Sequence, residues 1–411
     1  MDALRRRPAA PNGRRTAPGR LAWALAPALA IGLGATAARA DDAQADGARA
    51  LTLSGVYKLD VMGTVSGGLS HRATVLDNLS VNADLDLEKA LRWRGATLHV
   101  SFLSNQGGQP GVDAGSLQGV NNIEVVHQRA KVYEAWIDQA FADGAVDIKA
   151  GLFDTNSELN VTDSAGVFLA PTYGISSEVA ATGPNGPSIF PSLSLAARIN
   201  VKPAKDIYLR FAAVNALAND LGDPGGVDTS FSQGLLLWGE AGWTGDGKIA
   251  VGAWGYTKDQ PDLRDVLPSG DPKPSPTHGA YVMVDHPVAR NADGSARTSV
   301  FLRFGVSEGD TSPYRAAGSV GVNANHLFAS RPDDVLGVGF SWGTLSAKYR
   351  AVSADAGEPL DTAETAIEVT YAARFGQHFT LQPDLQYIHR PSGDPAIKDA
   401  LVLGVRGQVN F

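Results

Sequence analysis

The segment 400–411 constrains what this chain can fold into more than any other stretch. Apolar or small residues alternate there with polar ones, and the segment ends on an aromatic residue, Phe411. A period of two indicates a strand with one apolar and one polar face. The segments 366–375 and 379–389 repeat the pattern, with charged residues on the polar face. Strands of this kind that finish on phenylalanine are typical of outer-membrane β-barrels, although a secreted β-sandwich also alternates.

The N-terminus has the features of a secretory signal peptide. Six arginines precede residue 21, an apolar run covers 21–34, and Ala38-Arg39-Ala40 fits a small-residue cleavage site. The apolar run is too short for a membrane anchor and contains Pro27. We therefore expect residues 1–40 to be a signal peptide cleaved after Ala40, and 41–51 to be a short N-terminal lead.

The composition argues against several functional classes. The chain has no cysteine, which excludes disulfides and thiolate metal sites. Removing residues 1–40 takes seven arginines and one aspartate from totals of 35 basic and 43 acidic residues, which leaves a net charge of −14. Such an acidic chain is not expected to bind nucleic acid. The eight histidines form no metal-binding motif, so we also expect no metal and no cofactor.

The spacing of the alternating segments predicts sixteen strands between residues 52 and 411. Connections after odd-numbered strands are long, the longest being 154–191, whereas those after even-numbered strands are mostly tight, as at Gly245-Asp246-Gly247. Short turns at one rim and long loops at the other are typical of porins. The predicted fold is all-β: a transmembrane antiparallel β-barrel over 52–411, with short periplasmic turns and long extracellular loops.

Some segments fit this scheme less well. The link 287–297 is long for a turn and breaks the rule, whereas the links 64–77 and 307–318, before the segments 78–90 and 319–328, are long as the scheme requires. Within 335–350 the alternation flips near Gly343, for which a β-bulge or an excursion beyond the membrane would account.

The alternation also assigns side chains to the lipid or to the lumen, because an arginine or lysine facing lipid at mid-membrane costs about 2–4 kcal/mol. A register slip of one residue would move every charged side chain to the lipid face. The residues expected to face lipid include Tyr133, Ala135, Ile137, Ile148, Ala150, Leu152, Ile199, Leu209, Phe211, Leu302 and Phe304.

Five motifs in order resemble the carbohydrate-selective porin (OprB) family. They are Ala135-Trp136-Ile137-Asp138, the run 151–158, Ser188-Ile189-Phe190-Pro191, the run 331–337 and the run 382–387, followed by the closing strand 400–411. The resemblance spans nearly all of the mature chain. It implies a sixteen-stranded barrel in the bacterial outer membrane that lets glucose-type sugars diffuse into the periplasm. It also implies that Phe411 is the signal read by the barrel-insertion machinery, and that outer-membrane lipid surrounds the chain.

A pore selective for sugars needs hydrogen-bonding groups at a constriction and an aromatic face for the sugar ring. Trp136 lies between two carboxylates on one face and is the best candidate for stacking on a sugar. These side chains could equally pair with one another as structural ion pairs. The residues expected to line the pore and bind substrate are Glu134, Trp136, Asp138, Lys149, Arg198, Arg210, Arg303, Glu368 and Asp384.

The loop 154–191 is rich in glycine, proline and serine and contains Phe168, Tyr173 and Phe190. We expect it to fold into the lumen and constrict the pore; the alternative is an extracellular cover without solute contact.

The arginines expected to face inward are also compatible with a general or anion-selective porin instead of a sugar porin. The run Gly305–Gly309 matches G-x-S-x-G around Ser307, but no helical pattern follows, so we expect no enzyme. The sequence is also compatible with a homo-oligomer.

Overall fold

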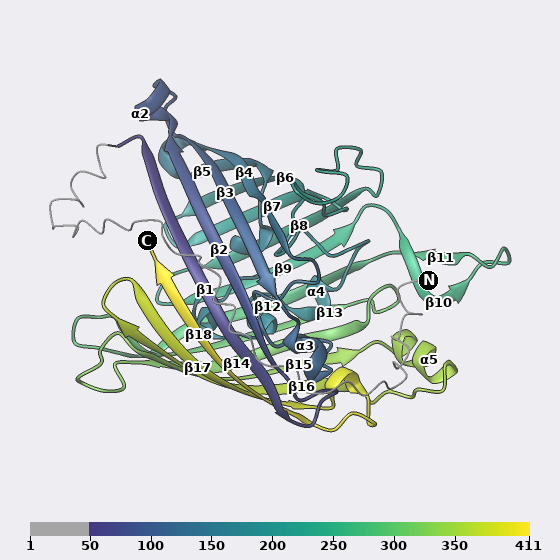
Figure 1. Cartoon of the computed structure of the whole chain (residues 1–411). Helices are drawn as coiled ribbons and strands as arrows, with labels where there is room; N and C mark the ends of the chain where they lie inside the picture. The colour runs from purple at the N-terminus through teal and green to yellow at the C-terminus, as the bar shows by residue number, and fades with distance from the viewer. Residues whose placement is uncertain (1–48) are drawn as a thin grey trace, which may run out of the picture. The chain divides into compact units, whose positions relative to one another are not determined.

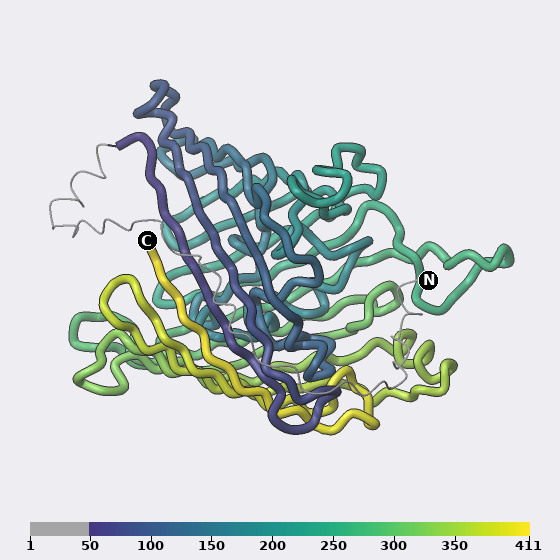
Figure 2. The backbone as a smooth tube through the Cα atoms, viewed as in Figure 1, coloured from purple at the N-terminus to yellow at the C-terminus, as the bar shows by residue number. Residues whose placement is uncertain are grey.

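The computed structural model describes residues 49–411, so the expected signal peptide lies outside the described residues. Sixteen antiparallel strands of these residues close into one barrel, in which β18 pairs with β1. Figures 1 and 2 show the yellow C-terminal strand running beside the purple N-terminal one. The barrel strands are β1 (Leu51–Ser66), β2 (Ala73–Asp86), β3 (Ala96–Gly107), β4 (Arg129–Phe141), β5 (Val146–Leu152), β6 (Leu195–Ala204), β7 (Ile207–Asn215), β8 (Leu235–Trp243), β9 (Lys248–Tyr256), β12 (His278–Arg290), β13 (Ala296–Ser307), β14 (Tyr314–Asn325), β15 (Val335–Leu345), β16 (Ala363–Phe375), β17 (Phe379–His389) and β18 (Ala400–Asn410).

The short elements lie in the connections. A small hairpin outside the barrel sheet, formed by β10 (Gln260–Val266) and β11 (Pro272–Ser275), extends away from the barrel wall (Figure 1). No helix within the described residues is long and apolar enough to cross a membrane. The helices are α2 (Leu87–Leu91), α3 (Pro110–Ala114), α4 (Ser177–Ala180) and α5 (Ala347–Asp355), with 3₁₀ turns η2 (Ala142–Gly144), η3 (Thr155–Ser157), η4 (Asp163–Val167), η5 (Pro171–Tyr173) and η6 (Pro391–Gly393).

The alternation in sequence produces the two faces of the wall. On β18 the outward Leu403 is 44 % exposed, whereas Arg406 faces the lumen and is 4 % exposed. The same parity places Arg198 and Arg303 inside, next to outward Ile199 and Leu302. The prediction of a sixteen-stranded antiparallel barrel is therefore confirmed, together with most of the face assignments.

Two residues that parity assigned to lipid instead lie inside. Tyr133 is 9 % exposed because a β-bulge, where β3 passes from Ser101 to Phe102, turns Tyr133 and Glu134 both inward. Leu152 is 3 % exposed and packs in the same interior cluster as Tyr133. The preceding residue, Gly151, has a φ of +138°, so the chain leaves the regular pleat just before Leu152.

Several expected boundaries are wrong, each for a local reason. The segment 78–90 ends as a strand at Asp86, whose side chain caps α2 by accepting from the Lys89 amide. The segment 335–350 likewise ends at Leu345, where the Ser346 hydroxyl caps α5. The expected flip near Gly343 does not occur, because β15 pairs with β16 without a bulge.

The strands β2 and β14 also begin earlier than expected. The connections 67–72 and 308–313 therefore have only six residues each, so loop lengths are less strictly sorted between the rims than the sequence indicates. The link after β12 is a turn of five residues, 291–295, because both flanking strands are longer than expected. The long connections that remain include 108–128 and 153–194, and these two fill much of the lumen.

Candidate functional site: the lumen and its two inward loops

Arg303 fastens loop 153–194 to the barrel wall. Its guanidinium is completely buried and donates to three loop carbonyls: those of Asn160 (2.8 Å), Gly174 (2.9 Å) and Thr172 (2.5 Å). The aromatic residues Phe168 and Tyr173 pack beneath the loop against Phe301 of β13. Part of the loop therefore lies inside the barrel against β13, and Arg303 has no exposed surface for a solute.

Glu368 holds the same loop from another strand. It is 1 % exposed and accepts from the amides of Leu169 (2.6 Å) and Ala170 (3.0 Å). Asp384 lies beside it on β17, 5 % exposed, and accepts from Gln386 at 2.8 Å. These two predicted pore-lining residues face inward but lie under the loop.

Loop 108–128 also enters the lumen and rests on an acidic side chain. Glu364 of β16 is buried and accepts from the Ser116 hydroxyl at 2.6 Å and from the amides of Leu117 (2.9 Å) and Gln118 (3.1 Å). Both loops are thus held inside the barrel in the same way: carboxylates of the wall accept hydrogen bonds from backbone amides of the loops.

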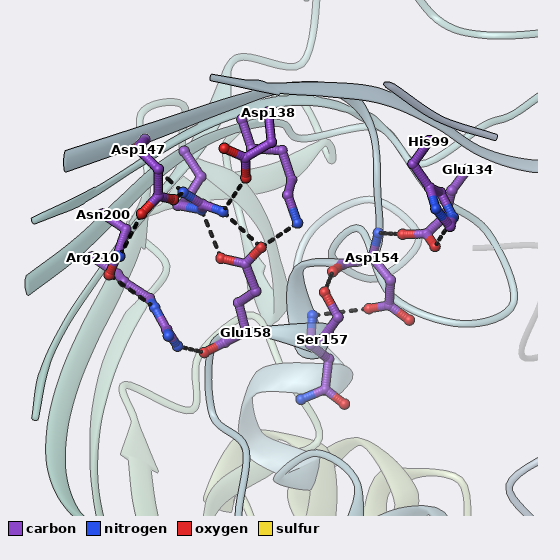
Figure 3. Close-up of polar contacts among 12 residues, drawn as sticks. His99, Glu134, Asp138, Asp147, Asp154, Ser157, Glu158, Asn200 and Arg210 are labelled. Carbon is purple, nitrogen blue, oxygen red and sulfur yellow. Dashed lines mark hydrogen bonds and ion pairs between the residues drawn. The ribbon is translucent and has the colours of Figure 1, made fainter. Parts of the chain in front are cut away.

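The wall formed by β4, β5 and β6 carries an ion-pair network centred on Arg198 (Figure 3). Arg198 binds Asp138 at 3.0 Å, Asp147, and the loop residue Glu158 at 2.6 Å. Lys149 also binds Glu158. Burial acts to raise the pKa of Glu158, but the bonds from Arg198 and Lys149 outweigh it and lower that pKa. Asp138, Lys149 and Arg198 therefore face the lumen as a paired set.

Arg210 extends the network to the loop backbone. Its guanidinium donates to the Glu158 carbonyl and, at 3.3 Å, to the Asn200 side chain, which in turn donates to Asp147 at 2.8 Å. Figure 3 shows Glu158 lying between Asp138 and Arg210. The start of loop 153–194 is therefore fixed to β4–β7, while its middle is fixed to β13 and β16.

The indole ring of Trp136 is in contact with other side chains of the protein. His99 stacks on the indole with ring centroids 4.6 Å apart, and the Lys149 ammonium lies 4.1 Å from a ring centroid. His99 is held by Asp84 at 2.7 Å and lies 3.5 Å from Glu134. Glu134 also accepts from the Asp154 amide at 2.9 Å. Trp136 faces inward as expected, but these contacts occupy much of the ring surface that a sugar would use.

The loops leave open the side of the lumen along β1–β4. A pocket of about 430 Å³ lies there, within the size range of small-molecule sites. We call it the lumen pocket. Its lining comprises the wall residues Lys58, Asn78, Ser80, Leu103 and Tyr133, residues 121–124 of the first loop, and Asp154, Asn156, Pro171, Gly174, Ile175, Ile189, Phe190 and Pro191 of the second.

The two carboxyl groups of the lumen pocket are held by protein donors. Asp154 accepts from the Tyr133 hydroxyl at 2.9 Å, and Glu124 from the Gly111 amide at 2.8 Å. Burial raises the pKa of Asp154 to about 6 and that of Glu124 to about 7. Among the described residues, no three His, Cys, Asp or Glu side chains come together as a metal site.

Sequence reasoning found most of the lumen wall but not the pocket. Lys58 and Asn78 are cross-strand partners on β1 and β2, and parity could have placed both inside. The expected strand 78–90 began at Asn78, which hid that pairing. No local signal could have shown that Asn121, Asn122 and Glu124 would join them, because loop 108–128 has no periodic pattern.

The model of the family described as "Carbohydrate-selective porin, OprB family" matches residues 70–411. The chain belongs to the carbohydrate-selective porin, OprB family. Porin B of Pseudomonas aeruginosa is 24 % identical over 402 residues, covering 86 % of this chain and 87 % of the relative. The putative porin QuiX of Acinetobacter baylyi is 21 % identical over 385 residues, covering 84 % and 86 %.

The fold agrees with this membership. A high-pH structure of Pseudomonas putida OprB superposes with a TM-score of 0.81 at 22 % identity, covering 90 % of this chain and 96 % of that one. The outer-membrane channel DcaP of Acinetobacter baumannii gives a TM-score of 0.56 at 11 % identity, covering 88 % and 97 %. This OprB-family protein is therefore a porin of the bacterial outer membrane, as the sequence predicts.

Proposed function

We propose that this porin carries neutral sugars by passive diffusion through the lumen pocket. The observation that carries the proposal is the position of the pocket, on the side of the lumen that the two loops leave unfilled. Amide and hydroxyl groups of Asn78, Ser80 and Asn156 can form hydrogen bonds with sugar hydroxyls. Phe190 offers an apolar face to the sugar ring; it meets Tyr133 edge to face, with ring centroids 6.3 Å apart. Such contacts admit a sugar without holding it, as diffusion requires.

The nine residues expected to bind substrate divide into two roles in this proposal. Arg303 and Glu368 position loop 153–194, and Arg198 with its paired neighbours fixes the start of that loop. Asp384 lies beside Glu368 in the wall and bonds to Gln386 of its own strand. The loop, thus held, constricts the lumen and forms one side of the pocket. Solute contact then falls mainly to the pocket residues, with Glu134 at its edge through Asp154.

Replacing Phe190 with alanine tests the aromatic face. Losing it should reduce the ratio of glucose to size-matched polyol permeation about two- to twelvefold, because an aromatic contact contributes about 0.5–1.5 kcal/mol beyond its area. The ratio is measured by swelling of liposomes that contain the purified protein. Phe328→Ala, at an exposed aromatic in the opposite-rim link 326–334, is the matched control. An unchanged ratio in the Phe190 variant would remove this residue from the sugar path.

A general or anion-selective porin is the second candidate. Arg210 favours it, since its guanidinium donates to a carbonyl and to an amide oxygen, and no carboxylate of residues 49–411 pairs with it. The Arg198 network argues against strong attraction of anions, because carboxylates of the protein already neutralise this arginine.

We also propose that the chain is not an enzyme. The Ser307 hydroxyl donates a hydrogen bond to the Tyr314 carbonyl at 2.6 Å, and it lies in the barrel wall rather than on a nucleophile turn.

We further propose export by the signal peptide 1–40, cleaved after Ala40, and insertion into outer-membrane lipid by the barrel-insertion machinery through Phe411. Either a single chain or a homo-oligomer fits this scheme.

Phe411→Ala tests the insertion signal. The Phe411 amide donates to the Gly55 carbonyl at 3.0 Å, and its carbonyl accepts from the Gly55 amide at 2.7 Å; both bonds survive loss of the ring. We therefore expect a severalfold lower amount of protein in the outer membrane, but unchanged heat resistance of the inserted fraction on gels. Normal membrane levels of the variant would contradict the signal role.

A further inference from the structure

The lumen pocket contains one lysine, Lys58 of β1. Within residues 49–411, no hydrogen bond or ion pair reaches the Lys58 ammonium. The carboxylate two residues along β1, Asp60, is already occupied, since Arg406 binds it at 2.8 and 2.7 Å and Asn121 at 2.6 Å. Other inward basic groups differ: Lys149 meets Glu158, and Lys131 meets Asp220 at 2.9 Å.

Neutral polar groups surround this ammonium on the same wall. Asn78 lies directly opposite Lys58 in the β1–β2 register, and no hydrogen bond within the described chain involves its side chain. Ser80 follows on the same face of β2. Directly paired residues have neighbouring Cβ atoms, so the ammonium and the amide form one patch of donors on the β1–β2 side. The Ser80 hydroxyl, which donates to Asn82 at 3.4 Å, lies diagonally across from Lys58.

The acceptors of the pocket lie on its loop side. Asp154 and Glu124 come from the two inward loops, and both are already bound by protein donors. Their raised pKa values, about 6 and about 7, limit the negative charge that they present near neutral pH. The pocket is thus polarised, with an unpaired cation on the strands and acceptors for hydroxyl donors on the loops.

From this arrangement we propose that the lumen pocket also binds and passes sugar acids, which are polyhydroxylated monocarboxylates of hexose size, with Lys58 receiving the carboxylate. The carboxylate would face β1 and β2, and the hydroxyls would face the loops. A charge-assisted hydrogen bond to an ammonium is stronger than a neutral one and suits a single carboxylate. This inference rests on the proposed sugar path but adds a solute class to it.

The test compares gluconate with glucose, which differ by one oxidised carbon and have nearly the same size. Proteoliposomes loaded with potassium and valinomycin hold the membrane potential constant while uptake of each labelled solute is measured. In Lys58→Gln the ratio of gluconate to glucose uptake should fall about tenfold, the effect of one charge-assisted bond. Lys58→Arg should keep the ratio within about twofold of the wild type, a factor well below the loss of one such bond.

The controls distinguish a local effect of Lys58 from a general effect of positive charge on the protein, and also from a failure of the proposed sugar permeation. Lys273→Gln makes the same charge change on the exposed hairpin β10–β11 and should leave the ratio unchanged. An unchanged ratio in Lys58→Gln, or an equal tenfold loss of chloride permeability, would overturn the proposal. Failure of the sugar path gives a different result: wild-type protein would then pass glucose no faster than a size-matched polyol.

Discussion

Replacing Arg303 with methionine should free loop 153–194 and, if that loop constricts the lumen as proposed, turn the pore into a wider, less selective one. The side chain is completely buried, and each of its three bonds to loop carbonyls is a charge-assisted bond that contributes about 1.5–3 kcal/mol. Methionine fills a similar volume but donates nothing, so the carbonyls of Asn160, Thr172 and Gly174 would be left buried without donors. The loop would then leave the wall, because water can satisfy these carbonyls only after the loop is released.

Planar bilayers and liposome swelling measure this outcome. Single-channel conductance should rise severalfold, and the preference for glucose over a size-matched polyol should disappear. Arg297→Met, which removes an exposed arginine near the opposite end of β13, should change neither. If the Arg303 variant inserts normally and keeps wild-type conductance and preference, the loop is not held by this side chain.

The barrel itself follows from local pattern in the sequence. Period-two alternation placed Arg198, Arg210 and Arg303 inside because the energetic penalty for a charge facing lipid applies to each strand separately. The pattern fails where the backbone departs from the regular pleat. At Tyr133 a bulge shifts the parity, and at Leu152 the positive φ of Gly151 does so. Neither departure has a marker in the alternation.

The lumen could not be predicted in the same way, because its contacts join distant parts of the chain. Glu368 accepts from the Leu169 amide across 199 positions, and Gln386 donates to the Val120 carbonyl across 266. Side chains that looked like solute contacts, such as Glu368 and Arg303, turn out to bind loop backbone. The sequence alone identifies such groups as inward and polar, but what they bind depends on where two aperiodic loops come to rest.

Raising the pH should loosen the α4 segment of loop 153–194, because the carboxyl group of Glu178 then loses its proton. Its carboxyl is completely buried, its two oxygens accept no hydrogen bond within the described residues, and it lies against Gly305 of β13, where an added Cβ would collide with it. Burial raises its pKa to about 8, against the partly compensating charge of Arg303. The docked loop therefore holds this carboxyl in its neutral form.

The direction of the pH effect follows from linkage. Below the ordinary glutamate pKa of 4.5, both the docked and the released loop carry the proton, and docking is fully favourable. Between that value and about 8 only the released form loses the proton, so docking weakens by about 1.4 kcal/mol for each pH unit. Above about 8 the loss is complete, and the docking free energy no longer changes with pH.

Hydrogen exchange of the peptide 172–186 between pH 5 and 9, corrected for the intrinsic rate, measures this loosening. Protection in the wild type should fall up to pH 8 and then level off. In Glu178→Gln the slope with pH should be smaller, with the decline between pH 7 and 8 lost, and protection should exceed the wild-type value at pH 9. Asp333→Asn, at an exposed carboxyl in the opposite-rim link 326–334, should behave as the wild type. Equal pH slopes in the wild type and Glu178→Gln would show that another group governs the loop, because a glutamine has no proton to lose in this range.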